Sequence, residues 1–84
     1  MNATEVRVMI EAGLPGAQVS VLSDDDTHFE AVIVAPQFTG KRMLQRHQLV
    51  YGTLGARMGR EIHALTMQVI APEEASRSAQ DRAG

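Results

Sequence analysis

The first residues of the chain show the hydrophobic spacing of one helix face. Val6, Met9 and Ile10 recur at positions i, i+3 and i+4, which is the period of an α-helix. Asn2 precedes this pattern and is followed three residues later by a glutamate, as in a capping box. We therefore predict a helix over residues 3–12 whose role is packing.

Two apolar segments rich in β-branched residues follow, with a polar turn between them. Residues 17–22 place Val19 and Val21 on one face, and residues 28–35 read HFEAVIVA, a composition typical of strands. The segment 23–27 contains three consecutive aspartates, which favour turns because their side chains bond to the local backbone. These features predict an antiparallel hairpin.

A longer helical pattern begins near Thr39 and Gly40. Its apolar stripe comprises Met43, His47, Val50, Leu54 and Met58. His47 lies within this stripe, and we interpret it as a core histidine that anchors the helix to the sheet. A glycine in a helix interior costs about 1 kcal/mol. We therefore expect the helix to break near Gly52 and a shorter helix to cover residues 53–58.

The C-terminal part predicts a further strand and a short helix. Residues 61–70 (EIHALTMQVI) form an apolar run that ends before Pro72. Two glutamates follow this proline, which suits the first turn of a helix. Residues 77–84 are expected to be a disordered tail, which leaves residues 1–76 as one domain. The predicted order is αββααβα, an α+β fold in which helices pack on a three-stranded mixed sheet.

The predicted topology brings two histidines together. The second and third strands are joined by a helical crossover, so they should be parallel. His28 opens the second strand and His63 lies two residues into the third. Both are therefore expected at one edge of the sheet, on strands about 4.8 Å apart. Two imidazoles at this separation could share one ligand.

Composition narrows the possible chemistry. The net charge is −2, with 44% hydrophobic and 21% charged residues, as in ordinary globular domains. The chain has no cysteine, so a bound metal or cluster would take its thiolates from another molecule. No signal peptide or membrane span is visible, and we expect a cytoplasmic protein without membrane association. The motifs of nucleophile elbows, phosphate-binding loops and H-E-x-x-H zinc sites are missing, which argues against an enzyme and a dedicated zinc site.

Four spaced motifs resemble those of BolA-like proteins. They are Thr27-His28-Phe29, Phe38-Thr39-Gly40, RHQLVY at residues 46–51 and Ile62-His63-Ala64-Leu65. The motifs follow that family's order over roughly residues 17–72. The short chain and the continuation VYG favour the short bacterial, IbaG-like branch. The resemblance implies an αββααβα fold similar to the class II KH arrangement.

The resemblance also implies partnership with a monothiol glutaredoxin, in which a [2Fe–2S] cluster bridges the two proteins. The family's C-terminal histidine ligand falls on His63, and the ligand of its variable loop falls on or beside His28. The partner's cysteine and a glutathione thiol would supply the other ligands. The family often places an aromatic residue in its last helix, where this chain has Ala75. We therefore expect weaker anchoring of that helix.

Nucleic-acid binding is the alternative function. Gly52-Thr53-Leu54-Gly55 matches the G-x-x-G loop with which KH domains clamp single strands, although its two middle residues are not basic. Residues 41–60 carry five basic side chains and no acid. The candidate contacts are Lys41, Arg42, Arg46, Gly52, Gly55 and Arg57.

Our leading expectation is a non-enzymatic adaptor in iron–sulfur trafficking or sensing and the stress response, with His63 and His28 as its cluster ligands. Alone, it would be a monomer or a weak homodimer. A transcriptional regulator that binds DNA or RNA is the alternative.

Overall fold

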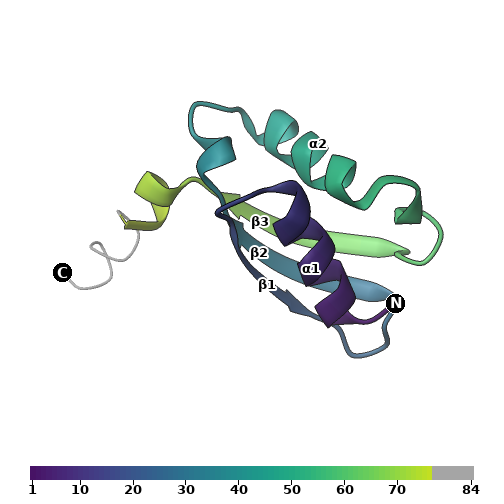
Figure 1. Cartoon of the computed structure of the whole chain (residues 1–84). Helices are drawn as coiled ribbons and strands as arrows, with labels where there is room; N and C mark the ends of the chain where they lie inside the picture. Colours follow the sequence, from purple (N-terminus) through teal and green to yellow (C-terminus); the bar gives the residue numbers. More distant parts are fainter. Residues whose placement is uncertain (77–84) are drawn as a thin grey trace.

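The computed structural model describes residues 1–76, and Figure 1 shows the arrangement of its elements. In chain order these elements are α1 (Ala3–Gly13), β1 (Gln18–Leu22), β2 (His28–Val34), the 3₁₀ helix η1 (Pro36–Phe38), α2 (Met43–Leu54), the 3₁₀ helix η2 (Gly55–Arg57) and β3 (Ala64–Ile70). Residues 72–76 are also helical. The predicted tail 77–84 lies outside the described residues. No helix among residues 1–76 has the length and hydropathy needed to cross a membrane.

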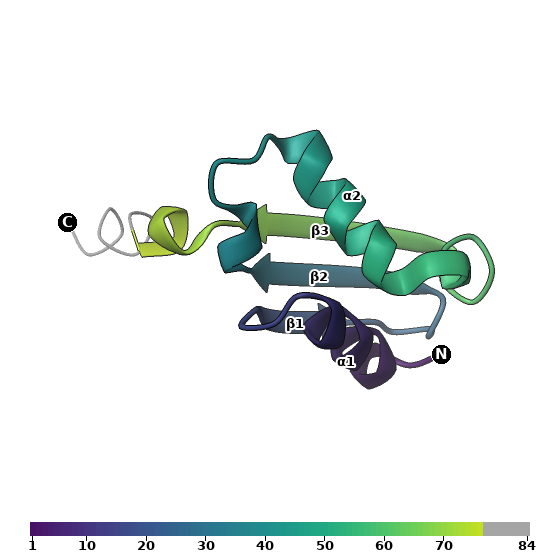
Figure 2. The same cartoon turned by 45° about the horizontal axis from the view of Figure 1, so that its top comes forward.

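The predicted three-stranded mixed sheet is confirmed. Its strand order is β1-β2-β3, with β1 antiparallel to β2 and β2 parallel to β3. Figure 2 shows the arrows of β2 and β3 pointing the same way, with α2 making the crossover between them. The residue that opens β2, His28, pairs with Ala64, the first residue of β3. This pairing fixes the register of β3 against β2 at this end of the sheet.

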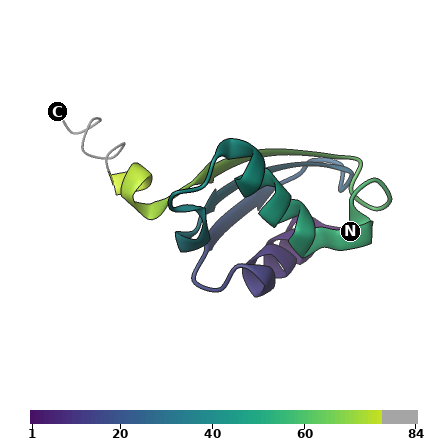
Figure 3. The same ribbon diagram turned by 90° about the horizontal axis from the view of Figure 1, so that it is seen from above.

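Within residues 1–76, helices α1 and α2 lie on the same face of the sheet and no helix covers the other face (Figure 3). Figure 3 shows α1 and α2 on the same side, with the strands forming the second layer. Alternate residues of β2 are buried and exposed, as expected for a sheet with one packed face and one open face. The largest fully buried side chains form the core between the layers: Phe29, Phe38, Ile10, Ile33, Leu54, Ile62, Val6 and Val50. The open face carries the exposed residues of all three strands.

Helix α1 follows the prediction closely. The Asn2 side chain accepts a hydrogen bond from the Glu5 backbone N–H at 2.9 Å, and the Asn2 N–H donates to Glu5 Oε1 at 3.2 Å, so the capping box is formed. The helix ends at Gly13, where it approaches α2. A Cβ at this position would lie 2.4 Å from Cγ2 of Thr53. The two helices can meet this closely only because residue 13 has no side chain.

The predicted bounds of the second helix are wrong at both ends. The helix begins at Met43 and not near Thr39, and it continues through Gly52 to Leu54. The predicted helix 53–58 is replaced by the end of α2 and by η2. The burial of apolar side chains on both sides of Gly52 outweighs its cost of about 1 kcal/mol in a helix. The break falls instead at Gly55, whose φ of 57° favours glycine.

The apolar stripe of this helix also differs from the prediction. Met43 is 57% exposed, and His47 is only half-buried, with its ring edge-to-face against Tyr51 at 6.3 Å between centroids. His47 is therefore not a core histidine. Arg46 takes the buried position in its place. The aliphatic stem of an arginine can pack against apolar neighbours when its guanidinium finds acceptors.

Strand β3 begins three residues later than predicted. Residues 58–63 form a tight turn in which the Gly59 N–H donates to the Ile62 carbonyl at 2.8 Å and the Ile62 N–H donates to the Arg57 carbonyl at 3.0 Å. Ile62 is fully buried and fixes this turn against the core. His63 is consequently the residue before the strand, and not its third residue as predicted.

Candidate metal-ligating site at the start of the parallel strands

The turn between β1 and β2 is closed by side-chain hydrogen bonds. The hydroxyl of Ser23 donates to the His28 carbonyl at 2.7 Å and accepts from the Asp26 N–H at 3.0 Å. Asp26 has a φ of 57°, a left-handed conformation that aspartate tolerates better than most residues. Ser23 therefore holds the backbone carbonyl of His28, the first residue of β2, against the turn.

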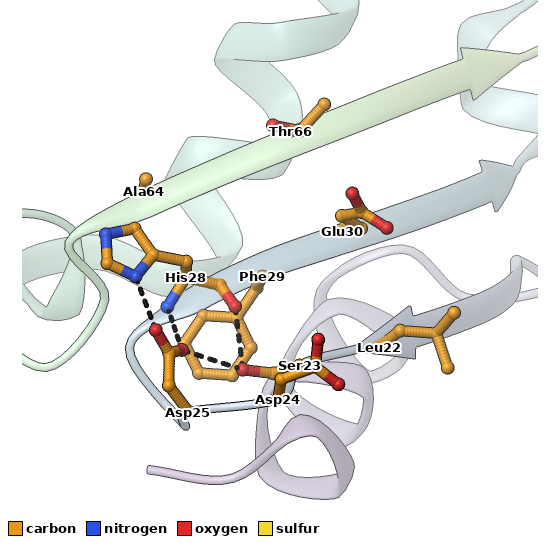
Figure 4. Close-up of a pocket in the computed structure, with 9 residues that line it drawn as sticks. All are labelled: Leu22, Ser23, Asp24, Asp25, His28, Phe29, Glu30, Ala64 and Thr66. Atoms are coloured by element: carbon orange, nitrogen blue, oxygen red, sulfur yellow. Dashed lines mark hydrogen bonds and ion pairs between the residues drawn. The ribbon is translucent and has the colours of Figure 1, made fainter.

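Asp25 binds His28 through both carboxylate oxygens. Its Oδ1 accepts from the backbone N–H groups of Thr27 and His28 at 3.0 and 2.9 Å, and its Oδ2 lies 2.7 Å from Nδ1 of the His28 ring (Figure 4). The hydrogen bond from the His28 backbone, followed by those from the His28 ring and the Thr27 backbone, holds the pKa of Asp25 well below its usual range. Asp25 is therefore an anion at neutral pH.

His28 is presented to solvent from this turn. Its side chain is 67% exposed, and Nδ1 is its one ring nitrogen with a hydrogen-bond partner within residues 1–76. The ring borders an open hollow on the uncovered face of the sheet, together with Leu22, Glu30, Ala64 and Thr66 (Figure 4). The second ring nitrogen, Nε2, remains available to a ligand from outside the chain.

The structure brings His63 to the same end of the sheet. The His63 N–H donates to the carbonyl of Thr27, the residue before His28, at 3.1 Å. The two histidines thus lie on neighbouring segments, offset by one residue because His28 pairs with Ala64. Their predicted meeting at one edge is correct for the backbone. Sharing of one ligand by the two rings stays a prediction.

The pleat of β3 does not set the direction of the His63 side chain. Ile62 is buried, His63 and Ala64 are both exposed, and Leu65 is half-buried. A regular strand would alternate, so the chain bends between Ile62 and the strand. His63 is accessible to solvent, but it is not among the residues that line the hollow beside His28.

The predicted nucleic-acid contacts separate into two groups. Lys41 and Arg42 are exposed at the start of α2, and no ion pair is formed by either within residues 1–76. Arg57 is ion-paired with Glu61 at 3.0 Å on the surface. Arg46 is buried and belongs to the packing of the domain. Of the predicted basic residues, Lys41 and Arg42 are therefore the two that are exposed and without an ion pair within residues 1–76.

The guanidinium of Arg46 joins three parts of the chain. It donates to the Lys41 carbonyl at 2.9 Å, to the Val69 carbonyl at 3.1 Å, and to Oε1 and Oε2 of Glu74 at 2.6 and 3.2 Å. Glu74 raises the pKa of Arg46. This ion pair anchors the first turn of the C-terminal helix, in place of the aromatic side chain whose absence predicted weak anchoring.

The G-x-x-G motif does not form a loop between two helices. Gly52 lies inside α2, Leu54 is buried at the end of that helix, and Gly55 is the residue that ends it. A KH-type clamp requires these residues to be accessible in a loop. The interpretation of Gly52 and Gly55 as a phosphate clamp is therefore wrong for this structure.

Sequence reasoning did not identify Asp25 and Glu74 as partners of the candidate residues. Asp25 precedes His28 by three residues, a spacing at which an aspartate often accepts hydrogen bonds from the following backbone. That pattern could have indicated the contact with the ring. Glu74 and Arg46 are 28 residues apart, and a single sequence gives no pattern that pairs them.

The fold and the site define a small two-layer α+β domain with an exposed, carboxylate-supported histidine at the amino end of two parallel strands. The sequence matches the family described as BolA-like protein over residues 2–74. The chain therefore belongs to the BolA-like family.

Three relatives illustrate this membership. The chain is 34% identical over 55 residues to the DNA-binding transcriptional regulator BolA of Escherichia coli, a match that covers 66% of this chain and 52% of the relative. It thus spans about half the length of that curated relative. A protein in the rpoN-murA intergenic region of Acinetobacter guillouiae is 36% identical over 75 residues, which are 88% of this chain and 89% of that protein. The structure of a BolA homologue from Coxiella burnetii is similar with a TM-score of 0.81 at 40% identity, and covers 92% of this chain and 99% of the homologue.

Proposed function

We propose that this protein is a non-enzymatic adaptor that shares a [2Fe–2S] cluster with a monothiol glutaredoxin in iron–sulfur trafficking or sensing. The observation that carries the proposal is the exposed imidazole of His28, whose Nδ1 is held by Asp25 while Nε2 has no hydrogen-bond partner within residues 1–76. His63, exposed one residue before the neighbouring strand, would supply the other imidazole of this chain.

The donor set fits such a cluster only with help from a partner. Residues 1–76 contain no group of three or more His, Cys, Asp or Glu side chains arranged to hold a metal ion, and the sequence has no cysteine. His63 would be the principal ligand from this chain and His28 the second. Cysteine and glutathione thiolates would come from the partner side. Histidine ligation of a cluster iron raises the reduction potential above that of an all-thiolate cluster.

The test is to titrate the protein into cluster-loaded monothiol glutaredoxin under anaerobic conditions and to record visible absorption and circular dichroism. The proposal predicts a spectral change that saturates at one equivalent per cluster. His63→Ala should abolish the change and His28→Ala should weaken it. His47→Ala is the matched control, because His47 lies on α2 beside Tyr51 and should leave the spectrum unchanged. An unaltered spectrum with the wild-type chain would refute the proposal.

A DNA- or RNA-binding regulator is the second candidate, favoured by the name of the Escherichia coli relative. The exposed basic side chains of Lys41 and Arg42 would contact the phosphates of the nucleic acid. Each phosphate contact contributes about 0.9 to the slope of log affinity against log salt, so Lys41→Glu with Arg42→Glu should weaken binding strongly and lower the magnitude of that slope by about 1.8. Absence of retardation of DNA and RNA fragments at low salt would exclude this function.

A further inference from the structure

Asp25 uses its two carboxylate oxygens for different purposes. Oδ1 accepts from the backbone of Thr27 and His28 and so belongs to the turn. Within residues 1–76, the hydrogen-bond partner of Oδ2 is the His28 ring alone, with Nδ1 at 2.7 Å. An ionised carboxylate can only accept hydrogen bonds. A neutral His28 ring must therefore carry its proton on Nδ1 to make this contact.

We propose that Asp25 is a positioning residue that holds neutral His28 in the Nδ1–H tautomer, so that Nε2 is the donor atom His28 offers to iron. This inference rests on the proposed function and specifies the ligating atom and the residue behind it. Histidines that bind metals usually donate their other ring N–H to a carboxylate or carbonyl, which fixes the tautomer and the ring orientation. Asp25 and His28 form this arrangement within one turn.

The turn itself does not require the contact between Oδ2 and the ring. Ser23 already closes the turn through the His28 carbonyl and the Asp26 N–H, and Oδ1 satisfies two further backbone donors. The bond from the ring to Oδ2 adds no backbone hydrogen bond. Its effect falls on the orientation and the tautomer of the imidazole, which are the properties that matter for a ligand.

Asp25→Asn separates these two roles. The asparagine Oδ1 can keep both backbone N–H groups of the turn, which places its amide Nδ2 where Oδ2 of the aspartate stood. That amide nitrogen can only donate, so Nδ1 of His28 must become the acceptor. The proton then moves to Nε2, and the nitrogen proposed to bind iron loses its lone pair. Asp24→Asn is the matched control, because it makes the same change of charge in the same turn, next to a residue that binds the ring.

The first experiment measures the tautomer of the isolated protein by NMR of ¹⁵N-histidine side chains at a pH where the imidazoles are neutral. A hydrogen bond to a charged group should favour the tautomer that forms it over the other neutral tautomer by about tenfold or more. His28 should therefore favour Nδ1–H by about tenfold in the wild type and in Asp24→Asn. In Asp25→Asn it should favour Nε2–H. His63 provides an internal reference, since its tautomer should be the same in all three proteins.

The inference is overturned if wild-type His28 is mainly the Nε2–H tautomer, or if Asp25→Asn leaves the tautomer unchanged. The wild-type measurement needs no variant, so a failure of the variant to fold does not remove the test. The cluster titration then separates the two proposals. A reversed tautomer in Asp25→Asn without any spectral change in the wild-type titration would sink the proposed function and leave the positioning role intact. Spectra of wild type and Asp25→Asn that change equally would show that His28 does not bind through Nε2.

Discussion

Replacing Arg46 by alanine should destabilise the domain more than replacing any exposed lysine or arginine. The guanidinium of Arg46 makes four hydrogen bonds, to two backbone carbonyls and to both oxygens of Glu74. Its side chain is 8% exposed, whereas that of Glu74 is 38% exposed. Removing the guanidinium leaves the buried carbonyl of Val69 without this donor and separates the C-terminal helix from α2.

The expected cost follows from these contacts. Loss of one partner of a buried ion pair costs about 3–5 kcal/mol, and a buried acceptor left unsatisfied costs about 1–3 kcal/mol within that total. Water can reach Glu74, so we place the cost near the lower limit, at about 3 kcal/mol. A domain of this length has a free energy of unfolding of roughly 4–12 kcal/mol. The single substitution therefore removes a quarter or more of the stability.

Urea unfolding followed by far-ultraviolet circular dichroism measures this cost. With an m-value of about 1 kcal/mol/M for a small domain, the midpoint should fall by about 3 M. Arg46→Lys should give an intermediate loss, because an ammonium keeps the charge but lacks the planar fork that reaches all four acceptors. Arg57→Ala is the control, since its ion pair with Glu61 is exposed and is worth about 0.5 kcal/mol. A fall of less than about 1 M for Arg46→Ala, at unchanged m-value, would refute the structural role.

Three further predictions concern packing and pH. Gly13→Ala should destabilise the domain by about 1–3 kcal/mol, because the new Cβ would lie 2.4 Å from Cγ2 of Thr53. A Cβ at position 52 meets nothing within 4 Å, so Gly52→Ala should stabilise α2 by about 0.5–1 kcal/mol. Thermal unfolding of both variants checks the opposite signs. Ile62→Ala should cost about 2–5 kcal/mol in urea unfolding, and should loosen the turn that positions the following histidine, seen as faster amide exchange there. The pKa of Asp25 in the folded state is lowered from 3.8, so the stability that its carboxylate contributes is complete above that pH and is lost as the pH falls through the folded-state pKa. The difference in unfolding free energy between wild type and Asp25→Asn should therefore shrink below pH 3.8. A difference that grows there would contradict the lowered pKa of Asp25.

The parallel pairing could be predicted because it depends on topology. A helix between two strands requires a crossover, and a crossover places the amino ends of the strands together. The topology alone therefore places His28 and His63 at one end of the sheet, whatever the side chains of the strands. It could not give the register, because the apolar run from residue 61 continues across the bend at Ile62. The one-residue offset between the histidines depends on that bend.

The helix errors have a different physical cause. Helix propensity disfavours both Gly52 and Gly55 equally, and only the tertiary packing of Leu54 decides which of them ends the helix. The burial of Arg46 was missed for a related reason, since three of its four hydrogen bonds go to the Val69 carbonyl of β3 and to Glu74, more than 20 residues away in the chain. Local patterns predict elements well and long-range polar partners poorly.

The structural role of Arg46 changes how nucleic-acid binding must be tested. An Arg46→Glu variant would place a new carboxylate against Glu74 and destabilise the domain, so a loss of DNA affinity in this variant could not be assigned to phosphate contacts. Lys41 and Arg42 are exposed and can be reversed in charge without breaking a core contact. They are the residues on which the regulator hypothesis can be judged.

The two candidate functions use opposite ends of the sheet. His28 and His63 lie where β2 and β3 begin, whereas Lys41 and Arg42 lie in the segment between η1 and α2 that follows the end of β2. Figure 2 shows this segment at the opposite end of the sheet from the starts of β2 and β3. The seven residues of β2 separate these ends by roughly 20 Å, which is about two and a half times the screening length of about 8 Å at physiological salt. Lys41→Glu with Arg42→Glu should therefore leave the cluster spectrum unchanged, and His63→Ala should leave the salt slope of DNA binding unchanged. A variant at one end that abolishes both activities in a folded protein would show that a single surface serves both partners.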